Sequence, residues 1–220
     1  MTYRGIDMAD LDKFLKKNIE GYLFSDLRSI VGTPPQTGHQ DAGVGYPLVM
    51  TAFAGIELLG ALLSERRFNT SNGRIYFQNY WTEYLYPSVI DSVAIADALY
   101  QLARHGIAHT YLVKGSLGIV RRQPTIHLKH LDGGLVYIDA VQLAEDLIQS
   151  YNSKVSAIAS LSTGTVNGET MRQRLNEIES KYNTQATSNP LTSFPRATVA
   201  ESPAVSTTFV PTTSGNCFKP

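Results

Sequence analysis

The stretch from Leu48 to Leu63, LVMTAFAGIELLGALL, decides the fold class, because it is apolar around its whole circumference and carries Glu57 as its one charge. Its sixteen residues fall short of the roughly 20 that a helix needs to cross a bilayer. A helix that is apolar nearly all round packs against neighbours on several sides. We therefore predict that this stretch is the central helix of a helical core and that the protein has no membrane span.

The composition indicates a folded soluble protein. Of the 220 residues, 43% are hydrophobic and 10% aromatic, which is enough apolar material to bury a core. Nineteen basic and nineteen acidic residues cancel, so any binding of nucleic acid must depend on a local patch. Cys217 is the only cysteine, which excludes an internal disulfide framework and a multi-thiolate metal site. The first residues lack the apolar region of a secretory signal, and we expect a cytoplasmic protein.

Apolar residues recur at helical spacing on both sides of the central stretch. They predict helices over about 11–30, 74–86, 88–102 and 139–158. Ser88, with Asp91 at the N3 position, is expected to cap the third of these helices, and Asp139, with Gln142 at N3, the fourth.

A β-hairpin is predicted between the last two of these helices. Apolar residues alternate with polar ones from Ile126 to Lys129, and the turn Asp132-Gly133-Gly134 precedes a second apolar run that ends at Ile138. The predicted fold is all-α, a bundle of about five helices over residues 1–162 with the hairpin inserted at about 124–138. A short amphipathic helix at 163–183 should dock on the bundle or on a partner. Residues 184–220, rich in Thr, Ser and Pro, are expected to be a disordered tail.

Charge is unevenly distributed along the chain. Residues 98–131 contain no Asp or Glu, yet carry five positive charges and four of the five histidines. This basic window is either a solvated hairpin with ordinary charges or an anion-binding surface. For the second interpretation the candidate nucleic-acid contacts are Lys114, Arg121, Arg122 and Lys129.

The stretch from Leu102 to Tyr111, LARHGIAHTY, lies inside the basic window. Its Arg104, His105 and His109 resemble the signature of the HEPN superfamily, the higher-eukaryote and prokaryote nucleotide-binding helical domains. That signature is an Arg, four to six residues and a His, often with a polar residue directly after the Arg. The resemblance extends over about residues 8–160, because this whole region is predicted to be a helical bundle. Within it, these three positions are the specific match. It implies a domain that dimerises and brings two copies of the motif together, where many relatives cut RNA without a metal.

The residue types of this motif suit that chemistry. Cleavage by the neighbouring 2′-hydroxyl requires one proton to be removed and another to be donated, which a histidine with a pKa near 6.5 can do at neutral pH. A guanidinium offers a fixed fork of donors to the charged transition state. We therefore assign Arg104 to transition-state stabilisation, His109 to general acid or base catalysis and His105 to positioning, although His105 could equally be a hydrogen-bonded structural residue. On an ideal helix Arg104 and His109 point about 140° apart, so they should meet across a dimer or through a break at Gly106.

No metal or other cofactor is expected. His105 and His109 would share a helix face, but neither a following Glu nor a thiolate accompanies them. The predicted function is a homodimeric, metal-independent endoribonuclease or an RNA- or nucleotide-binding protein. The alternative is a non-catalytic helical interaction module that binds RNA, nucleotide or an acidic protein partner. Glu57 should pair with a cation, and Arg74 and Arg104 are the candidates.

Overall fold

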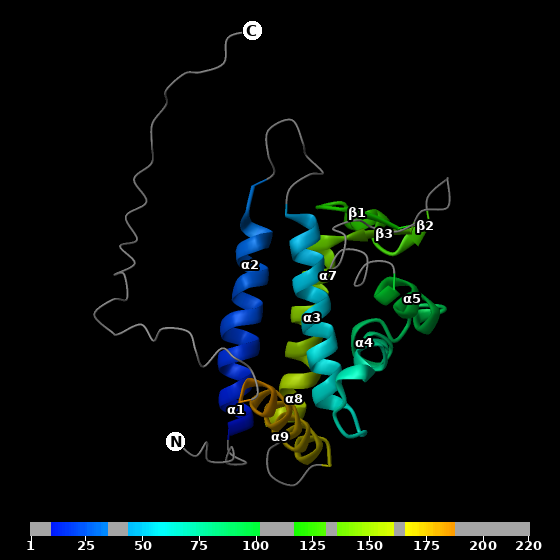
Figure 1. Cartoon of the computed structure of the whole chain (residues 1–220). Coiled ribbons are helices and arrows are strands. Elements are labelled where there is room, and N and C mark those ends of the chain that lie inside the picture. The colour runs from blue at the N-terminus through cyan, green and yellow to red at the C-terminus, as the bar shows by residue number, and fades with distance from the viewer. Residues whose placement is uncertain (1–9, 35–43, 102–116, 131–135, 161–165, 188–220) are drawn as a thin grey trace, which may run out of the picture. The chain divides into compact units, whose positions relative to one another are not determined.

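The computed structural model describes residues 10–34, 44–101, 117–130, 136–160 and 166–187 (Figure 1). Most of these residues are helical and one small sheet accompanies them, so the helical character predicted from the sequence is confirmed. The chain divides into two compact units, Met1–Tyr182 and Asn183–Pro220.

Helices occupy most of the spans where the sequence predicted them. The first helical run is continuous and contains a π-helical segment between two α-helical ones: α1 (Asp10–Phe14), η1 (Leu15–Leu23) and α2 (Phe24–Gly32). The remaining helices are α3 (Gly45–Leu63), η2 (Thr70–Asn72), α4 (Gly73–Tyr80), η3 (Trp81–Leu85), α5 (Ser92–Leu99), η5 (Pro124–Ile126), α7 (Ala140–Ser150), η6 (Tyr151–Val155), α8 (Ser156–Ser160) and α9 (Val166–Thr187).

The predicted central helix is α3. Ten of its nineteen residues are buried, and it packs against α2, α4, α7 and β1 (Leu117–Val120). In Figure 1, α3 lies between α2 and α4. Within the described ranges it is the one helix long and apolar enough to cross a membrane, a property that buried core helices share.

Close approach of α3 and α4 is possible because Gly60 has no side chain. A Cβ atom at Gly60 would lie 1.9 Å from the carbonyl oxygen of Tyr76 on α4. Large aromatic side chains on the same helical run as Tyr76 fill the core beside this crossing; Tyr76, Phe77, Tyr80 and Trp81 are each at most 1% exposed.

The sheet differs from the predicted hairpin. The strands β1, β2 (Lys129–His130) and β3 (Val136–Asp139) are ordered β1-β3-β2; β1 runs parallel to β3, and the two-residue β2 runs antiparallel to it. The hairpin predicted over about 124–138 is wrong for the main strand pair, which is parallel; only the short pairing of Lys129 and His130 with Tyr137 and Val136 has the predicted antiparallel direction. Leu128 has a φ of 55°, a left-handed conformation that a strand does not accommodate. It ends the alternating stretch in which the first hairpin strand was predicted.

Of the two predicted helix caps, the one at Ser88 is wrong and the one at Asp139 is confirmed. Ser88 lies in a turn and does not cap α5, which begins at Ser92 after Asp91 turns the chain with a φ of 56°. The cap predicted at Asp139 is confirmed, because its Oδ1 accepts the backbone N–H groups of Val141 and Gln142 at 2.9 Å each.

The amphipathic helix predicted near the C-terminus docks on the bundle. Met171, Leu175 and Ile178 of α9 belong to the same core as α3 and α4. Burial of this stripe supplies the packing that a short, charged helix needs.

Candidate functional site

The predicted catalytic residues, Arg104, His105 and His109, lie outside the described residues, as does Lys114. The structure does describe α5, the helix that leads to them. Its Ala96 and Leu99 are buried in the core, and the ring of Tyr100 lies 5.5 Å from that of Phe77. In the sequence, Arg104 comes four residues after Tyr100, so the motif follows a helix that is packed in the core.

Arg121, predicted as a nucleic-acid contact, is a buried residue of which 4% is exposed. Its Nη2 donates to the carbonyl oxygens of Ile30, Val31 and Thr33, at 3.2, 2.9 and 2.5 Å. These carbonyls lie at the C-terminal end of α2, where the last carbonyls of a helix have no intrahelical partner and the helix dipole favours a cation. Arg121 thus caps α2, and its position differs from that of a surface phosphate contact.

The other two described candidates, Arg122 and Lys129, are exposed. Arg122 lies beside Arg121 at the end of α2, where its Nη2 donates to the carbonyl oxygen of Val31 at 3.3 Å. Lys129 is on β2, on the other side of β3 from β1. The structure therefore brings Arg122 to Arg121 but does not place Lys129 beside them.

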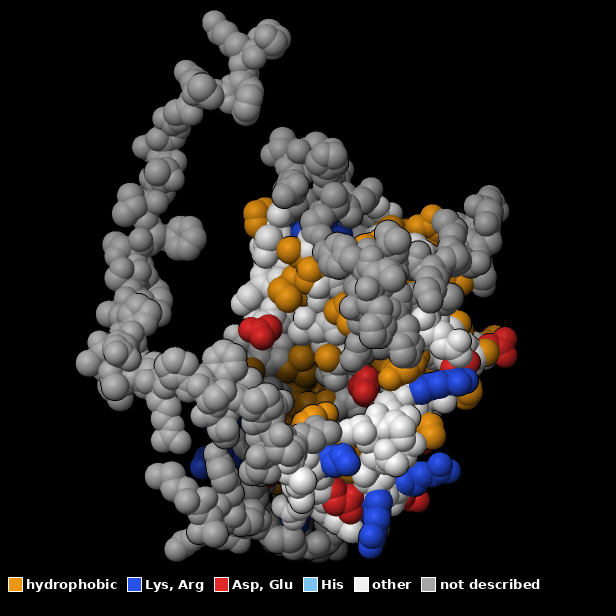
Figure 2. All heavy atoms as spheres, viewed as in Figure 1, with side chains coloured by type: hydrophobic (Ala, Val, Ile, Leu, Met, Phe, Trp, Pro, Cys, Tyr) orange, Lys and Arg blue, Asp and Glu red, His pale blue; other side chains and the backbone are white. Residues whose placement is uncertain are grey.

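A second group of charged side chains lies near the end of α3. Figure 2 shows Lys and Arg side chains at the lower right of the viewed face, near the turn between α3 and α4, with Asp and Glu side chains among them. The exposed Arg66 and Arg67 belong to this turn. Glu65 directly precedes them and lowers the local charge, so the sequence does not mark them as a basic patch.

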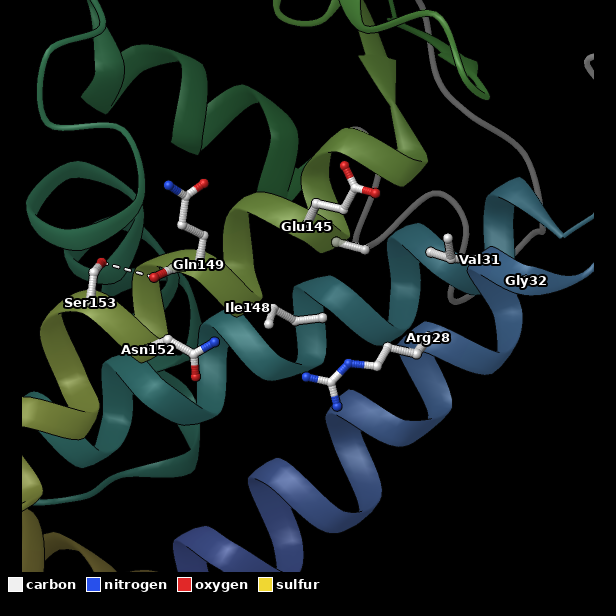
Figure 3. A pocket seen from close by; sticks show the side chains of 9 residues that line it. Arg28, Val31, Gly32, Glu145, Ile148, Gln149, Asn152 and Ser153 are labelled. Atoms are coloured by element: carbon white, nitrogen blue, oxygen red, sulfur yellow. Dashed lines mark hydrogen bonds between the residues drawn. The ribbon is translucent and has the colours of Figure 1, made fainter.

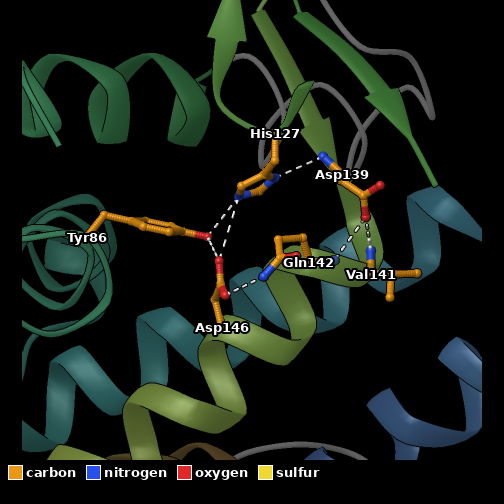
Figure 4. A network of polar contacts seen from close by, with 6 residues as sticks. All are labelled: Tyr86, His127, Asp139, Val141, Gln142 and Asp146. Atoms are coloured by element: carbon orange, nitrogen blue, oxygen red, sulfur yellow. Dashed lines mark hydrogen bonds and ion pairs between the residues drawn. The ribbon is translucent and has the colours of Figure 1, made fainter. Parts of the chain in front are cut away.

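A network of polar side chains joins η3, the sheet and α7 (Figure 4). His127 accepts the backbone N–H of Asp139 at Nδ1, over 3.0 Å, and its Nε2 lies 2.9 Å from the hydroxyl oxygen of Tyr86. That hydroxyl donates to Oδ2 of Asp146 at 2.7 Å, and Gln142 donates to Oδ1 of the same carboxylate at 2.7 Å. The His127 side chain is 7% exposed, so this network is a buried connection between three elements.

These contacts determine the protonation of His127. Because Nδ1 accepts a hydrogen bond, the proton of the neutral ring is on Nε2, where it can be donated to Tyr86. Burial lowers the pKa of His127, against the opposing effects of Asp146 and Asp139. Burial, together with the charge of Asp146, also raises the pKa of Tyr86 far above its ordinary value. Both groups are therefore neutral at physiological pH, as a structural hydrogen-bond chain requires.

Little in the amino-acid sequence indicates this network. In the sequence His127 is one residue of the basic window. It is 41 residues from Tyr86, which in turn is 60 residues from Asp146. Contacts over such separations leave no local pattern. The one local signal was the helical i, i+4 spacing of Gln142 and Asp146.

The neutral state of His127 has a consequence for stability. Below about pH 6.5 the unfolded chain binds a proton on this histidine that the folded chain excludes, so the free energy of unfolding should fall as the pH is lowered. The variant His127→Gln has no titrating side chain at this position and so lacks this contribution to the pH dependence of stability. We expect the stability advantage of the wild type over the variant to be constant above about pH 6.5 and to shrink below it. Urea titrations between pH 5 and pH 8 measure the difference; parallel curves for the two proteins would contradict the assignment.

An open groove of about 680 Å³ lies between α2 and α7 (Figure 3). Its apolar lining comes from Val31, Ala144 and Ile148, and Arg28 and Glu145 are among its polar lining residues. It could not be predicted from the sequence, because it exists only where two helices more than a hundred residues apart lie side by side.

Within the described ranges, no three His, Cys, Asp or Glu side chains are close enough to hold a metal ion. Comparison of the chain with protein-family models, with curated proteins and with solved structures found no match. The function must therefore be inferred from the residues of the chain itself.

Proposed function

We propose that this chain is a cytoplasmic, homodimeric RNA-cleaving domain of the HEPN type, with its site at Arg104, His105 and His109. The observation that supports the proposal is the sequence setting of the motif: Arg104 comes five residues after the end of α5, a helix packed in the core of a helical bundle. Ala96 and Leu99 anchor α5 in the core. Catalytic groups must be held within hydrogen-bond reach of the atoms they serve, and attachment to a packed helix supports such positioning.

The proposed reaction needs no group beyond the two copies of the motif. His109 of one protomer removes the proton of the 2′-hydroxyl, whose oxygen attacks the adjacent phosphorus. The bond from phosphorus to the 5′-oxygen breaks, and the partner's His109 donates a proton to that oxygen. Arg104 donates hydrogen bonds to the non-bridging oxygens, where negative charge accumulates. The products are a 2′,3′-cyclic phosphate and a free 5′-hydroxyl.

Contacts to the RNA backbone are assigned to Lys114, Arg122 and Lys129. Arg122 and Lys129 are exposed, as a phosphate contact requires. Arg121 contributes indirectly, because its bonds to the end of α2 fix the backbone on which Arg122 follows.

The decisive variant is His109→Ala. It should lower the rate of RNA cleavage by roughly 10²-fold or more, since it removes the proton transfer, and EDTA should have no effect on the wild type. His39→Ala changes a histidine outside the basic window and serves as the matched control. Cleavage of a labelled RNA is measured on samples whose folding and dimerisation are checked by circular dichroism and light scattering.

A non-catalytic interaction module is the second candidate function. It is favoured by the groove between α2 and α7, whose apolar residues lie beside charged Arg28 and Glu145, the composition of a partner-binding surface. A wild type that binds RNA without cleaving it would replace the nuclease by this module. So would a folded, dimeric His109→Ala variant that cleaves as fast as the wild type.

A further inference from the structure

The groove between α2 and α7 (Figure 3) has the size and composition of a small-molecule site. Its volume of about 680 Å³ lies within the range of roughly 300–1,000 Å³ that such sites occupy, often between the helices of a bundle. Val31, Ala144 and Ile148 supply an apolar surface, and Arg28 and Glu145 supply the charges of the described lining. Both charged residues are exposed. A ligand from solvent can therefore reach an apolar wall and a charge in the same groove.

Arg28 is held in place while its hydrogen-bond donors stay unused. Its Cζ atom lies 5.9 Å from the centroid of the Phe24 ring, a cation–π contact. The ring of Phe24 is buried and packs edge-on against Tyr151, with the centroids 5.0 Å apart. Figure 3 shows the Arg28 side chain extending from α2 toward α7. Among the described residues, its guanidinium forms no hydrogen bond or ion pair, so its fork of N–H donors is open to a ligand.

The charges in and beside the groove favour an anionic ligand. Arg121 and Arg122 both donate to the carbonyl oxygen of Val31, a lining residue, at 2.9 and 3.3 Å. Two further cations therefore lie at the Val31 end of the groove. Two carboxylates oppose them: Glu145 in the lining, and Asp139, whose charge acts on Arg121. With the guanidinium of the lining, three cations stand against two anions, and this excess makes the local potential positive.

We propose that this groove binds a small aliphatic carboxylate, of the kind of a medium-chain fatty acid. The carboxylate pairs with Arg28, because a guanidinium matches the two oxygens of a carboxylate with two parallel hydrogen bonds. The hydrocarbon chain lies on Val31, Ala144 and Ile148, where burial of its methylene groups favours binding. This site uses none of the residues assigned to RNA cleavage and does not depend on that reaction.

The length of the groove suits an extended chain. Its wall on α7 and η6 runs from Ala144 to Ser153, which is about 13 Å at a rise of about 1.5 Å per residue. An extended aliphatic chain of medium length spans a similar distance and follows the open groove without bending.

A nucleotide is also anionic but fits the groove less well. Its base needs an aromatic or guanidinium plane on which to stack. The described residues that line the groove include no aromatic side chain, and their one guanidinium is needed for the phosphate. An aliphatic carboxylate makes no such double demand on Arg28.

The charge of the ligand is tested with a matched pair of probes. Octanoate and octan-1-ol have chains of the same length, but only octanoate is anionic. Calorimetry or ligand-detected NMR on the full chain should show octanoate binding at least about fivefold more tightly, although the alcohol is the more apolar probe. Equal affinities, or tighter binding of octan-1-ol, would show a groove that recognises no head group and would overturn the proposal. Absence of octanoate binding at roughly 10 mM would also overturn it and would leave the groove to a protein partner.

Variants of the charged residues test recognition of the head group. Arg28→Gln should weaken octanoate binding about five- to tenfold and leave octan-1-ol unaffected. Arg66→Gln is the matched control, because Arg66 is an exposed arginine outside the groove, and it should change neither affinity. Glu145→Gln removes a like charge from the lining and should tighten octanoate about twofold. If folded Arg28→Gln protein binds octanoate as tightly as the wild type, the carboxylate does not pair with Arg28 and the proposal fails.

A variant of the apolar wall tests the location of the chain. Ile148→Ala removes part of the surface on which the hydrocarbon lies, so it should weaken octanoate and octan-1-ol alike, by about three- to tenfold. Ile90→Ala is the matched control, because Ile90 is 85% exposed and lies outside the groove. Thermal unfolding of each variant without ligand verifies the fold. Octanoate binding that survives both Arg28→Gln and Ile148→Ala in folded protein would place the ligand elsewhere and refute the proposal.

Discussion

Gly60→Ala should lower the free energy of unfolding by about 3 kcal/mol or more. The added Cβ would lie 1.9 Å from the carbonyl oxygen and 2.7 Å from the carbonyl carbon of Tyr76. Both atoms belong to the backbone of α4, so no side-chain rotation can relieve the overlap. The two helices must separate. Forced overpacking of this kind typically lowers the free energy of unfolding by about 1 to 3 kcal/mol, and occasionally by more. Separation also disturbs the buried ring of Phe77, which lies 4.9 Å from that of Phe53 on α3.

The control for this variant is Gly32→Ala, at the end of α2. No atom lies within 4 Å of the position that its Cβ would occupy. Alanine restricts the unfolded chain and favours the helix, so we expect stability to be unchanged or to rise by about 0.5 to 1 kcal/mol. Urea denaturation followed by circular dichroism compares the two variants. If both unfold at the same urea concentration as the wild type, the close crossing of α3 and α4 is incorrect.

Arg121→Ala should lower the free energy of unfolding by about 3 to 4 kcal/mol. The change removes the hydrogen bonds of one charged NH₂ group, whose two protons are shared among three carbonyl oxygens, each charged bond contributing about 1.5 kcal/mol or more. It also removes the cation at the negative end of the α2 dipole.

Arg122→Ala makes the same change of charge and size one residue later and is the matched control. Arg122 is exposed and makes a single bond of 3.3 Å to Val31, so its loss should cost less than about 1 kcal/mol. Chemical denaturation at two salt concentrations separates the variants. If Arg121→Ala is no less stable than Arg122→Ala, Arg121 does not cap α2, and the surface role predicted from its sequence should be reconsidered.

Local signals explain what could be predicted from the sequence. The apolar run of α3, the stripe of α9 and the cap at Asp139 each depend on residues within a few positions of one another. Helical bonds and caps operate over the same short range. These elements therefore lie where the pattern placed them.

Long-range contacts explain what could not be predicted. Strand β1 pairs in parallel with β3 and packs against α3, and both contacts join residues far apart in the sequence. The left-handed conformation of Leu128 is equally invisible in a pattern of alternating side chains. Burial of Arg121 is decided by residues of α2, and nothing next to Arg121 in the sequence distinguishes it from the exposed Arg122. The catalytic assignment to Arg104, His105 and His109 stays a prediction.

Because Arg121 caps α2 from far along the chain, α2 is synthesised well before the residue that completes its C-terminal end. The three hydrogen bonds of Arg121 join residues 88, 90 and 91 positions apart, so they cannot form until Arg121 has left the ribosome. Closing a loop of this length costs conformational entropy, and this cost is offset only when the contacts between the distant segments have formed. A nascent chain truncated before β1 therefore carries α2 with a frayed end, and translation must pass Arg121 before that end is protected from hydrogen exchange and proteolysis.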